Sequence, residues 1–202
     1  MAETKVDGLT GLRERKKVRT HEAIQEAALR LFHKQGYAAT TVEQIAEAAE
    51  VSPSTFFRYF PSKEDVVIHD ALDPLLLAAF GEQPAELSPI QALRASMAAV
   101  FGALSPDELA LERERQELVL AVPELRERML DDLAATIRGY AEALAARVGR
   151  SADELRVRAF AGAVFGAGIA VWLTSSEGGP MPDYMEQFDA AMAWLDDCGL
   201  RL

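Results

Sequence analysis

Two helix starts lie close together between residues 40 and 63, and this spacing constrains the fold more than any other feature of the sequence. Thr40 and Thr41 are followed three residues later by Glu43 and Gln44, so either threonine fits the pattern of a capping box at the start of a helix. Ser52 followed by Pro53 is a second start, because Ser caps a helix and Pro fits its first turn. Only a two-residue turn remains between the helices, so they must cross sharply.

The second of these helices has two distinct faces. Phe56 and Phe60 lie four residues apart, so they point to one side and are suited to packing on Ile45 of the first helix. An exposed mixture of hydroxyl groups, an aromatic ring and a guanidinium suits the major groove of DNA, where Arg reads guanine and hydroxyls reach phosphate. The opposite face and its flanks carry these groups: Pro53, Ser54, Phe57 and Arg58, with Thr55 and Tyr59 beside them.

The order VSPSTFFRYFPSK resembles the recognition helix of TetR-family transcriptional regulators, and the segment from about Arg19 to Ala71 resembles their whole DNA-binding domain. Glu50 departs from the pattern, since the family often has glycine there, and Phe57 lacks the hydroxyl of the usual tyrosine. Lys63 does match the family pattern. A cation at the N-terminus of a helix is unfavourable beside the positive end of the helix dipole, so an outside phosphate explains this lysine better. DNA contacts are therefore expected from nine residues: Thr41, Ser52, Pro53, Ser54, Thr55, Phe57, Arg58, Tyr59 and Lys63.

Charge separates the chain into two parts. The net charge of −11 is unusual for a DNA-binding protein, but residues 1–65 carry ten Lys and Arg against ten Asp and Glu. Residues 66–202 carry 11 against 22, and all five lysines lie in the first part. The acidic second part would be repelled by phosphate and so oriented away from it, although general solubility also explains its acidity.

Enzyme chemistry has no positive support in the sequence. Cys198 is the only cysteine, which excludes an intrachain disulfide and a cysteine-rich zinc site, and the three histidines lack metal-ligand spacing. A phosphate-binding loop and a nucleophile elbow are absent, so no catalytic residue, metal or cofactor is predicted. No apolar run approaches the roughly 20 residues that cross a bilayer. The charged N-terminus is unlike a signal peptide, so we expect a cytoplasmic protein without a membrane partner.

Helical periodicity throughout the chain predicts an all-α protein. Residues 1–18 lack apolar periodicity and are expected to form a flexible basic arm. This arm could contact DNA or be a plain solvated tail, and the sequence favours neither alternative. Residues 19–71 should form a three-helix domain with the helix-turn-helix, and 72–202 a larger helical domain for effector binding and dimerisation. The first helix is expected from near Thr20 to Gln35, and another from Ser62 past Leu75. Capping and breaking residues place the later helices at about 89–103, 106–121, 123–149, 151–176 and 182–198.

The 151–176 helix is rich in small residues, and its three internal glycines each cost roughly 1 kcal/mol relative to alanine. Close approach of another helix would explain them. The last two helices resemble those that TetR-family proteins pair across a two-fold axis into a four-helix bundle; close packing within one chain is the alternative. The expected dimer interface comprises Gly162, Phe165, Gly166, Ile169, Tyr184, Phe188, Met192 and Leu195.

The resemblance also implies a pocket for a small effector in the C-terminal domain. Apolar or weakly polar residues on inward helix faces are the candidates, and each could instead be ordinary core: Met97, Phe101, Gln116, Met129, Thr136, Tyr140 and Trp172. The nature of the effector is left open by the sequence.

The leading functional interpretation is a homodimeric regulator that represses from a palindromic operator on double-stranded DNA and is released by a small-molecule effector. A helical ligand-binding or enzymatic protein that retains the helix-turn-helix only as scaffold is the main alternative. A nonspecific architectural DNA binder is disfavoured, because the chain is acidic and lacks a broad basic surface.

Overall fold

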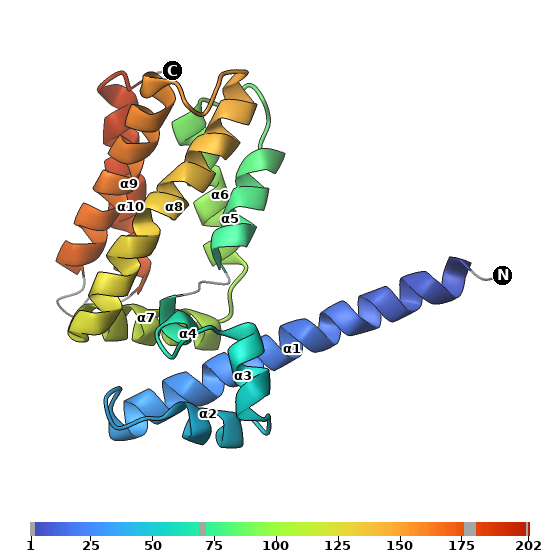
Figure 1. Cartoon of the computed structure of the whole chain (residues 1–202). Helices are drawn as coiled ribbons and strands as arrows, with labels where there is room; N and C mark the ends of the chain where they lie inside the picture. The colour runs from blue at the N-terminus through green and yellow to red at the C-terminus, as the bar shows by residue number, and fades with distance from the viewer. Residues whose placement is uncertain (1–2, 69–71, 176–180, 201) are drawn as a thin grey trace. The chain divides into compact units, whose positions relative to one another are not determined.

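The protein is all α-helical, and no strand occurs in the part of the chain that the structure describes (Figure 1). The chain divides into two compact units, Met1–His69 and Asp70–Leu202, two residues before the boundary expected from the sequence. The computed structural model describes residues 3–68, 72–175, 181–200 and 202.

Within these residues the helices follow in the order α1 (Glu3–Gln35), α2 (Val42–Ala48), α3 (Pro53–Tyr59), α4 (Asp65–Ile68), α5 (Leu72–Glu82), α6 (Pro89–Gly102), α7 (Pro106–Ala121), α8 (Pro123–Val148), α9 (Leu155–Ser175) and α10 (Met181–Asp197). The starts expected at Ser52 and Ser105 are confirmed, and of Thr40 and Thr41 it is Thr41 that caps α2, because each of these hydroxyls accepts a hydrogen bond from a backbone N–H three residues later. Ser88 caps α6 in the same way.

The first unit is built on the C-terminal half of α1. This helix packs on α2 and α4, and α2 packs on α3. Gly36 ends α1 with a positive φ of 85° and donates its N–H to the Phe32 carbonyl at 2.9 Å, as the sequence predicts for a left-handed cap. Gln25 joins α1 to α4, since its amide donates to the Val66 carbonyl at 3.1 Å. A shared apolar core is buried between the helices: Ile24, Ala27, Ala28, Phe32, Ile45, Ala46, Phe56, Phe60, Val66 and Val67.

The expected start of the first helix is wrong. The first helix begins at Glu3 rather than near Thr20, so residues 3–18 of the expected arm are helical. These residues are rich in Lys, Arg, Glu and Leu, which favour helix, and a helix nucleated in the core extends without an apolar face of its own. The single helix expected from Ser62 past Leu75 is described over Asp65–Ile68 (α4) and again from Leu72 (α5), and the residues between these segments lie outside the described part of the chain. Ala71, which that helix was to include, lies outside the described residues.

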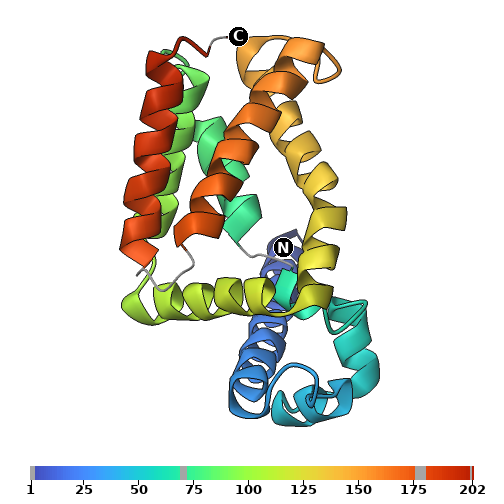
Figure 2. The same cartoon turned by 90° about the vertical axis from the view of Figure 1, so that its left-hand side faces the viewer.

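In the second unit, α5, α6, α8, α9 and α10 lie side by side, and α7 runs across one end of them (Figure 2). The helix α9 packs on both α8 and α10, and α10 also packs on α6. An ion pair reinforces this last contact, because the Arg94 guanidinium donates to both carboxylate oxygens of Asp189, at 2.6 and 2.7 Å. Arg147 ties α8 to the loop after α5 by donating to the carbonyls of Gln83 and Leu87, at 3.0 and 3.1 Å.

The helix α9 differs from its expected form in two ways. It begins at Leu155 rather than Ser151. Its segment Leu155–Thr174 is also long and apolar enough to cross a membrane by length and composition, contrary to the expectation that no such run exists. Only 22% of that apolar window is buried within the chain. Much of this apolar helix therefore faces outward.

Candidate functional site

The helix α3 is held by contacts at its start and in the turn before it. The Ser52 hydroxyl accepts the Thr55 N–H at 3.1 Å, and Pro53 occupies the first turn. Glu50, in the turn, has a positive φ of 54°, which explains why glycine is convenient there. The predicted two-residue turn therefore lies between the C-cap Ala49 and the N-cap Ser52, with a strained residue in place of glycine.

The two faces of α3 separate as the sequence predicts. Phe56 and Phe60 are fully buried in the core of the first unit, whereas the ring of Phe57 is 52% exposed. Thr55 and Tyr59 are half-buried on the flanks. The remaining residues expected to contact DNA from this helix and its cap are exposed: Ser52, Pro53, Ser54 and Arg58.

Hydroxyl groups gather at the start of the exposed face. The Ser52 oxygen lies 2.9 Å from the Ser54 hydroxyl and 3.0 Å from the Thr55 hydroxyl. At the other end, the Arg58 guanidinium lies 5.4 Å from the centre of the Tyr59 ring, a cation–π distance. The face thus presents small donors and acceptors at one end, a cation at the other, and an exposed aromatic ring between them.

Lys63 has a structural role that the sequence did not reveal. Its ammonium donates to the backbone carbonyls of Tyr37 and Thr40, at 3.0 and 3.1 Å, and lies 4.0 Å from the centre of the Tyr37 ring. These bonds use two of its three N–H groups and fasten the loop before α2 to the turn before α4. These contacts explain the lysine without an outside phosphate, and one N–H remains for the expected contact with DNA.

We expect the Lys63→Ala change to destabilise the first unit by roughly 1–3 kcal/mol, because two carbonyls lose a charged donor. Urea unfolding followed by circular dichroism measures the effect, with Lys34→Ala as control because Lys34 is exposed on α1. Equal stability of the two variants would show that the Lys63 bonds contribute nothing in solution.

Neighbouring contacts support the same loop. The Thr41 hydroxyl accepts the Gln44 N–H at 3.3 Å, so this expected DNA contact also caps α2. The Tyr37 hydroxyl donates to a Glu64 carboxylate oxygen at 2.6 Å, and the ring is buried as predicted. Burial raises the pKa of Glu64, but hydrogen bonds, foremost that from Tyr37, outweigh it and hold the pKa below its usual value.

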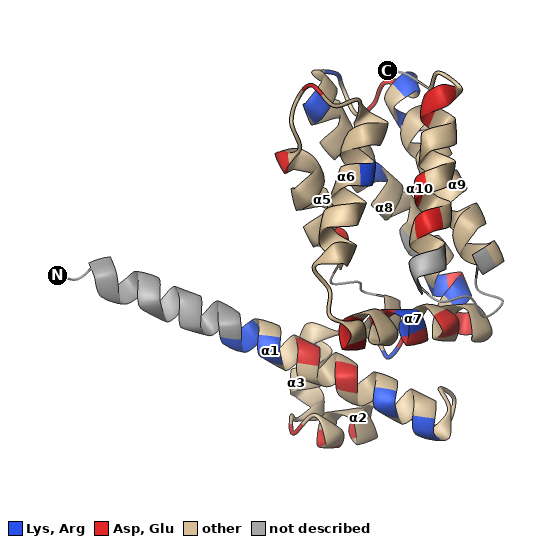
Figure 3. Ribbon diagram, turned by 180° about the vertical axis from the view of Figure 1, so that it is seen from behind, with Lys and Arg blue, Asp and Glu red and all other residues tan. Residues whose placement is uncertain are grey.

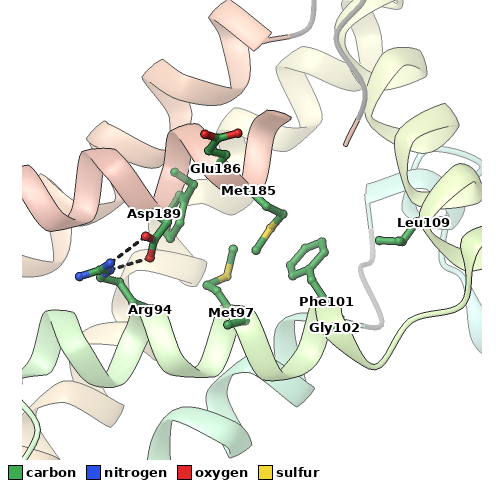
Figure 4. Close-up of a pocket in the computed structure, with 10 residues that line it drawn as sticks. Arg94, Met97, Phe101, Gly102, Leu109, Met185, Glu186 and Asp189 are labelled. Carbon is green, nitrogen blue, oxygen red and sulfur yellow. Dashed lines mark hydrogen bonds and ion pairs between the residues drawn. The ribbon is translucent and has the colours of Figure 1, made fainter. Parts of the chain in front are cut away.

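A cavity of about 400 Å³ opens between α6, α7 and α10 of the second unit (Figure 4). Met97 and Phe101 line it, as expected of two of the seven ligand candidates. Most of the residues that line the cavity could not be predicted from the sequence, because they come from three helices whose packing no periodicity specifies. These further lining residues are Arg94, Ala98, Gly102, Leu109, Met185, Glu186, Phe188 and Asp189.

The other five ligand candidates lie away from this cavity. Gln116 donates to Glu112 at 2.9 Å on α7. Tyr140 is buried, with ring centres 5.4 Å from Phe80 and 5.7 Å from Phe165. Its hydroxyl has no hydrogen-bond partner among the described residues, and burial raises its pKa. The remaining three are half-buried on α8 and α9: Met129, Thr136 and Trp172.

The expected dimer residues fall into three groups. Phe188 and Met192 are buried in the core of the second unit, so their assignment to a surface that a second copy covers is wrong. Gly166 is exposed, and a Cβ added there would meet no atom of the chain within 4 Å. The others are half-buried: Gly162, Phe165, Ile169, Tyr184 and Leu195.

A third glycine of α9 accounts for part of the small-residue pattern by packing within the chain. A Cβ added at Gly168 would lie 3.2 Å from the Phe188 ring, so this glycine lets α9 approach α10. The alternative of intrachain packing therefore holds for Gly168, whereas Gly162 and Gly166 face open space.

Both units match known protein families. The family described as bacterial regulatory proteins, tetR family, matches residues 24–69, and the MftR C-terminal domain matches residues 87–198. The chain is 42% identical over 151 residues to the HTH-type transcriptional regulator TcmR of Streptomyces glaucescens, covering 71% of this chain and 67% of that protein. It is 26% identical over 187 residues to the mycofactocin biosynthesis regulator MftR of Mycobacterium tuberculosis, covering 90% and 94%.

Solved structures share the fold at lower identity. Thermus thermophilus FadR, a TetR-family repressor crystallised with lauroyl-CoA, has a TM-score of 0.51 and 23% identity, with 87% of this chain and 92% of that chain covered. SmeT, the repressor of a Stenotrophomonas maltophilia multidrug efflux pump, has a TM-score of 0.54 and 21% identity, with 90% and 93% covered. Given the family matches along both units, the chain belongs to the TetR family of transcriptional regulators.

Proposed function

We propose that the protein is a sequence-specific repressor that binds a palindromic operator as a homodimer and is released by a small-molecule effector. The observation that carries this proposal is the division of α3, which buries Phe56 and Phe60 and leaves a polar and aromatic face to solvent. A scaffold helix has no need for an exposed phenylalanine beside an exposed arginine. Such a face suits thymine methyl groups and guanine in a major groove.

The distribution of charge supports binding through the first unit. The ribbon in Figure 3 marks mainly Lys and Arg positions along the described part of α1, and mainly Asp and Glu positions along α7 of the second unit. Three basic residues of α1 are exposed: Lys16, Lys17 and Arg19. We propose that they contact phosphates, and that the protein acts in the cytoplasm, where its DNA partner lies.

The outward face of α9 supports the dimer. Beside the exposed Arg156, Arg158 and Thr174, its exposed apolar and small residues recur every three or four positions and form one stripe: Leu155, Ala159, Ala163, Gly166, Ala170 and Leu173. Trp194 of α10 is also 65% exposed. An apolar stripe of this length needs cover in water. A second copy supplies it in the two-fold arrangement and places two recognition helices about 34–36 Å apart on DNA.

Ligand release is supported by the cavity and by the relatives. FadR was crystallised with lauroyl-CoA and SmeT with triclosan, so proteins of this fold accept ligands with a large apolar part. An effector would release the repressor by favouring a dimer whose recognition helices are spaced wrongly for the operator.

Selection of oligonucleotides from a random pool tests the proposal. We expect enrichment of a palindrome whose half-sites lie about one helical turn apart, roughly 10 base pairs. Recovery of no enriched palindrome would favour the helical protein that keeps its helix-turn-helix only as scaffold. Enrichment of any duplex without sequence preference would favour an architectural DNA binder.

A further inference from the structure

We infer that the cavity between α6, α7 and α10 is the effector site and that it takes a positively charged ligand with an aromatic body. This inference rests on the proposed function in one respect, since only a DNA-binding regulator converts occupancy into operator release. The shape of the cavity and the charge at its rim each contribute a separate part of the argument.

The walls favour an aromatic body. Met97 and Phe101 come from α6, and Met185 and Phe188 from α10. Figure 4 shows the side chains of Met97, Met185 and Phe101 converging on the same space. A volume of about 400 Å³ lies within the range of cavities that hold drug-sized molecules. Flexible thioethers adapt to differently shaped ligands and make favourable contacts with aromatic rings.

The rim favours a positive charge. Arg94 is the basic residue of the lining, and Asp189 already neutralises it through two short hydrogen bonds. Glu186 adds a second carboxylate, and it forms no ion pair with any other residue that the structure describes. Asp196 and Asp197 lie near enough to raise the pKa of Arg94 further. The rim therefore has a net negative charge.

The charged residues at the rim favour a cationic ligand over an anionic one. A cation gains Coulomb attraction from Glu186 without disturbing the Arg94–Asp189 pair. An anion must displace Asp189 from Arg94 and leave that carboxylate beside Glu186 without its partner, which is costly. The acidic second unit adds repulsion of anions at longer range.

Two probes of nearly equal size and shape test the sign of the charge. Tetraphenylphosphonium and tetraphenylborate are titrated into the full-length protein without DNA, and binding is measured by calorimetry. We expect the phosphonium to bind at least about tenfold more tightly. Equal affinity, or tighter binding of the borate, would overturn the assignment of ligand charge.

Two neighbouring alanines of α6 test the location. Ala98 lines the cavity and Ala99 does not, and both are exposed, so a larger side chain disturbs the core at neither position. Ala98→Phe should fill the cavity and weaken phosphonium binding by about tenfold or more, whereas Ala99→Phe should leave it unchanged. If both variants bind like the parent protein, the phosphonium binds elsewhere and the site is wrong.

A matched pair of acidic residues tests the role of the rim. Glu186→Gln should reduce the preference for the phosphonium over the borate several-fold. Glu142→Gln, at an exposed acidic residue of α8 outside the cavity, should leave the preference unchanged. Equal effects of the two changes would assign the preference to overall charge and overturn the role of Glu186.

Operator release is measured separately, with the selected palindrome and added phosphonium. If phosphonium releases the Ala99→Phe variant from the operator but not the Ala98→Phe variant, the cavity is supported as the effector site. Phosphonium binding in the cavity without release overturns the effector role, although the binding site itself stands. Failure of the proposed function is distinct from both outcomes, because it shows as the absence of a selected palindrome.

Discussion

The Gly166→Leu protein is expected to lose its two-fold partner while each chain stays folded. Within the chain, a Cβ at Gly166 meets no atom of another part of the structure within 4 Å, so α9 can accommodate the leucine. Leucine also has a higher helix propensity than glycine. Across the proposed interface, the same side chain stands where two helices approach. Overpacking costs on the order of 1–3 kcal/mol per site, and the two-fold axis applies it twice.

Loss of the dimer should appear in operator binding as well. The dissociation constant of the dimer should rise by roughly one to four powers of ten, since 1.4 kcal/mol is a factor of ten. Affinity for the paired half-sites should fall with it, without any change in α3. Sedimentation and operator binding measured across the same range of protein concentration test both effects.

Gly81→Leu is the matched control for this change. Gly81 is also exposed within a helix, α5, and a Cβ added there meets no atom within 4 Å. This variant should remain dimeric and bind the operator normally. A Gly166→Leu protein that sediments as the same dimer would show that the outward stripe of α9 is covered by something other than a second copy.

Local chemistry predicted most of the fold because helix ends are determined by a few residues. The caps at Thr41, Ser52 and Ser105 needed only their own sequence neighbours, so the helices that they start were placed correctly. The start of α1 had no such signal. A helix that extends outward from a core lacks both a cap and an apolar stripe. The sequence pattern therefore predicts an arm over residues 1–18.

Tertiary packing determined what sequence analysis missed. Phe188 and Met192 were correctly recognised as one apolar face of α10, but periodicity does not say whether a face packs inside the chain or against a second copy. The structural role of Lys63 has no sequence signature, because its acceptors are the backbone carbonyls of Tyr37 and Thr40. The cavity likewise depends on where three helices meet.

Arg58→Ala is expected to change which operator the protein prefers. Arg58 is exposed near the end of α3 and is held over the Tyr59 ring at 5.4 Å. A bidentate contact from arginine to guanine is worth about 1–3 kcal/mol of discrimination. The alanine variant should therefore bind the selected operator roughly 5- to 150-fold more weakly and accept other base pairs at one position of each half-site.

Lys63→Ala supplies the comparison that separates base contact from phosphate contact. With one N–H left for a phosphate, Lys63 should affect all sequences equally, and its loss should reduce the slope of log affinity against log salt by about one. Temperatures well below the unfolding transition of this variant are needed, since the loop that it holds is also weakened. Arg30→Ala serves as a second control, because Arg30 is an exposed arginine of α1 paired with Glu26 at 3.7 Å.

The two contacts can be told apart by measuring affinity for every single-base variant of the operator over a range of salt concentrations. A base contact by Arg58 predicts that the loss is large at one base pair and small elsewhere. The cation–π contact with Tyr59 supports this reading, because a guanidinium held in one orientation loses less entropy when it forms two directed hydrogen bonds. A uniform loss across all sequences, together with a lower salt slope, would assign Arg58 to the DNA backbone instead.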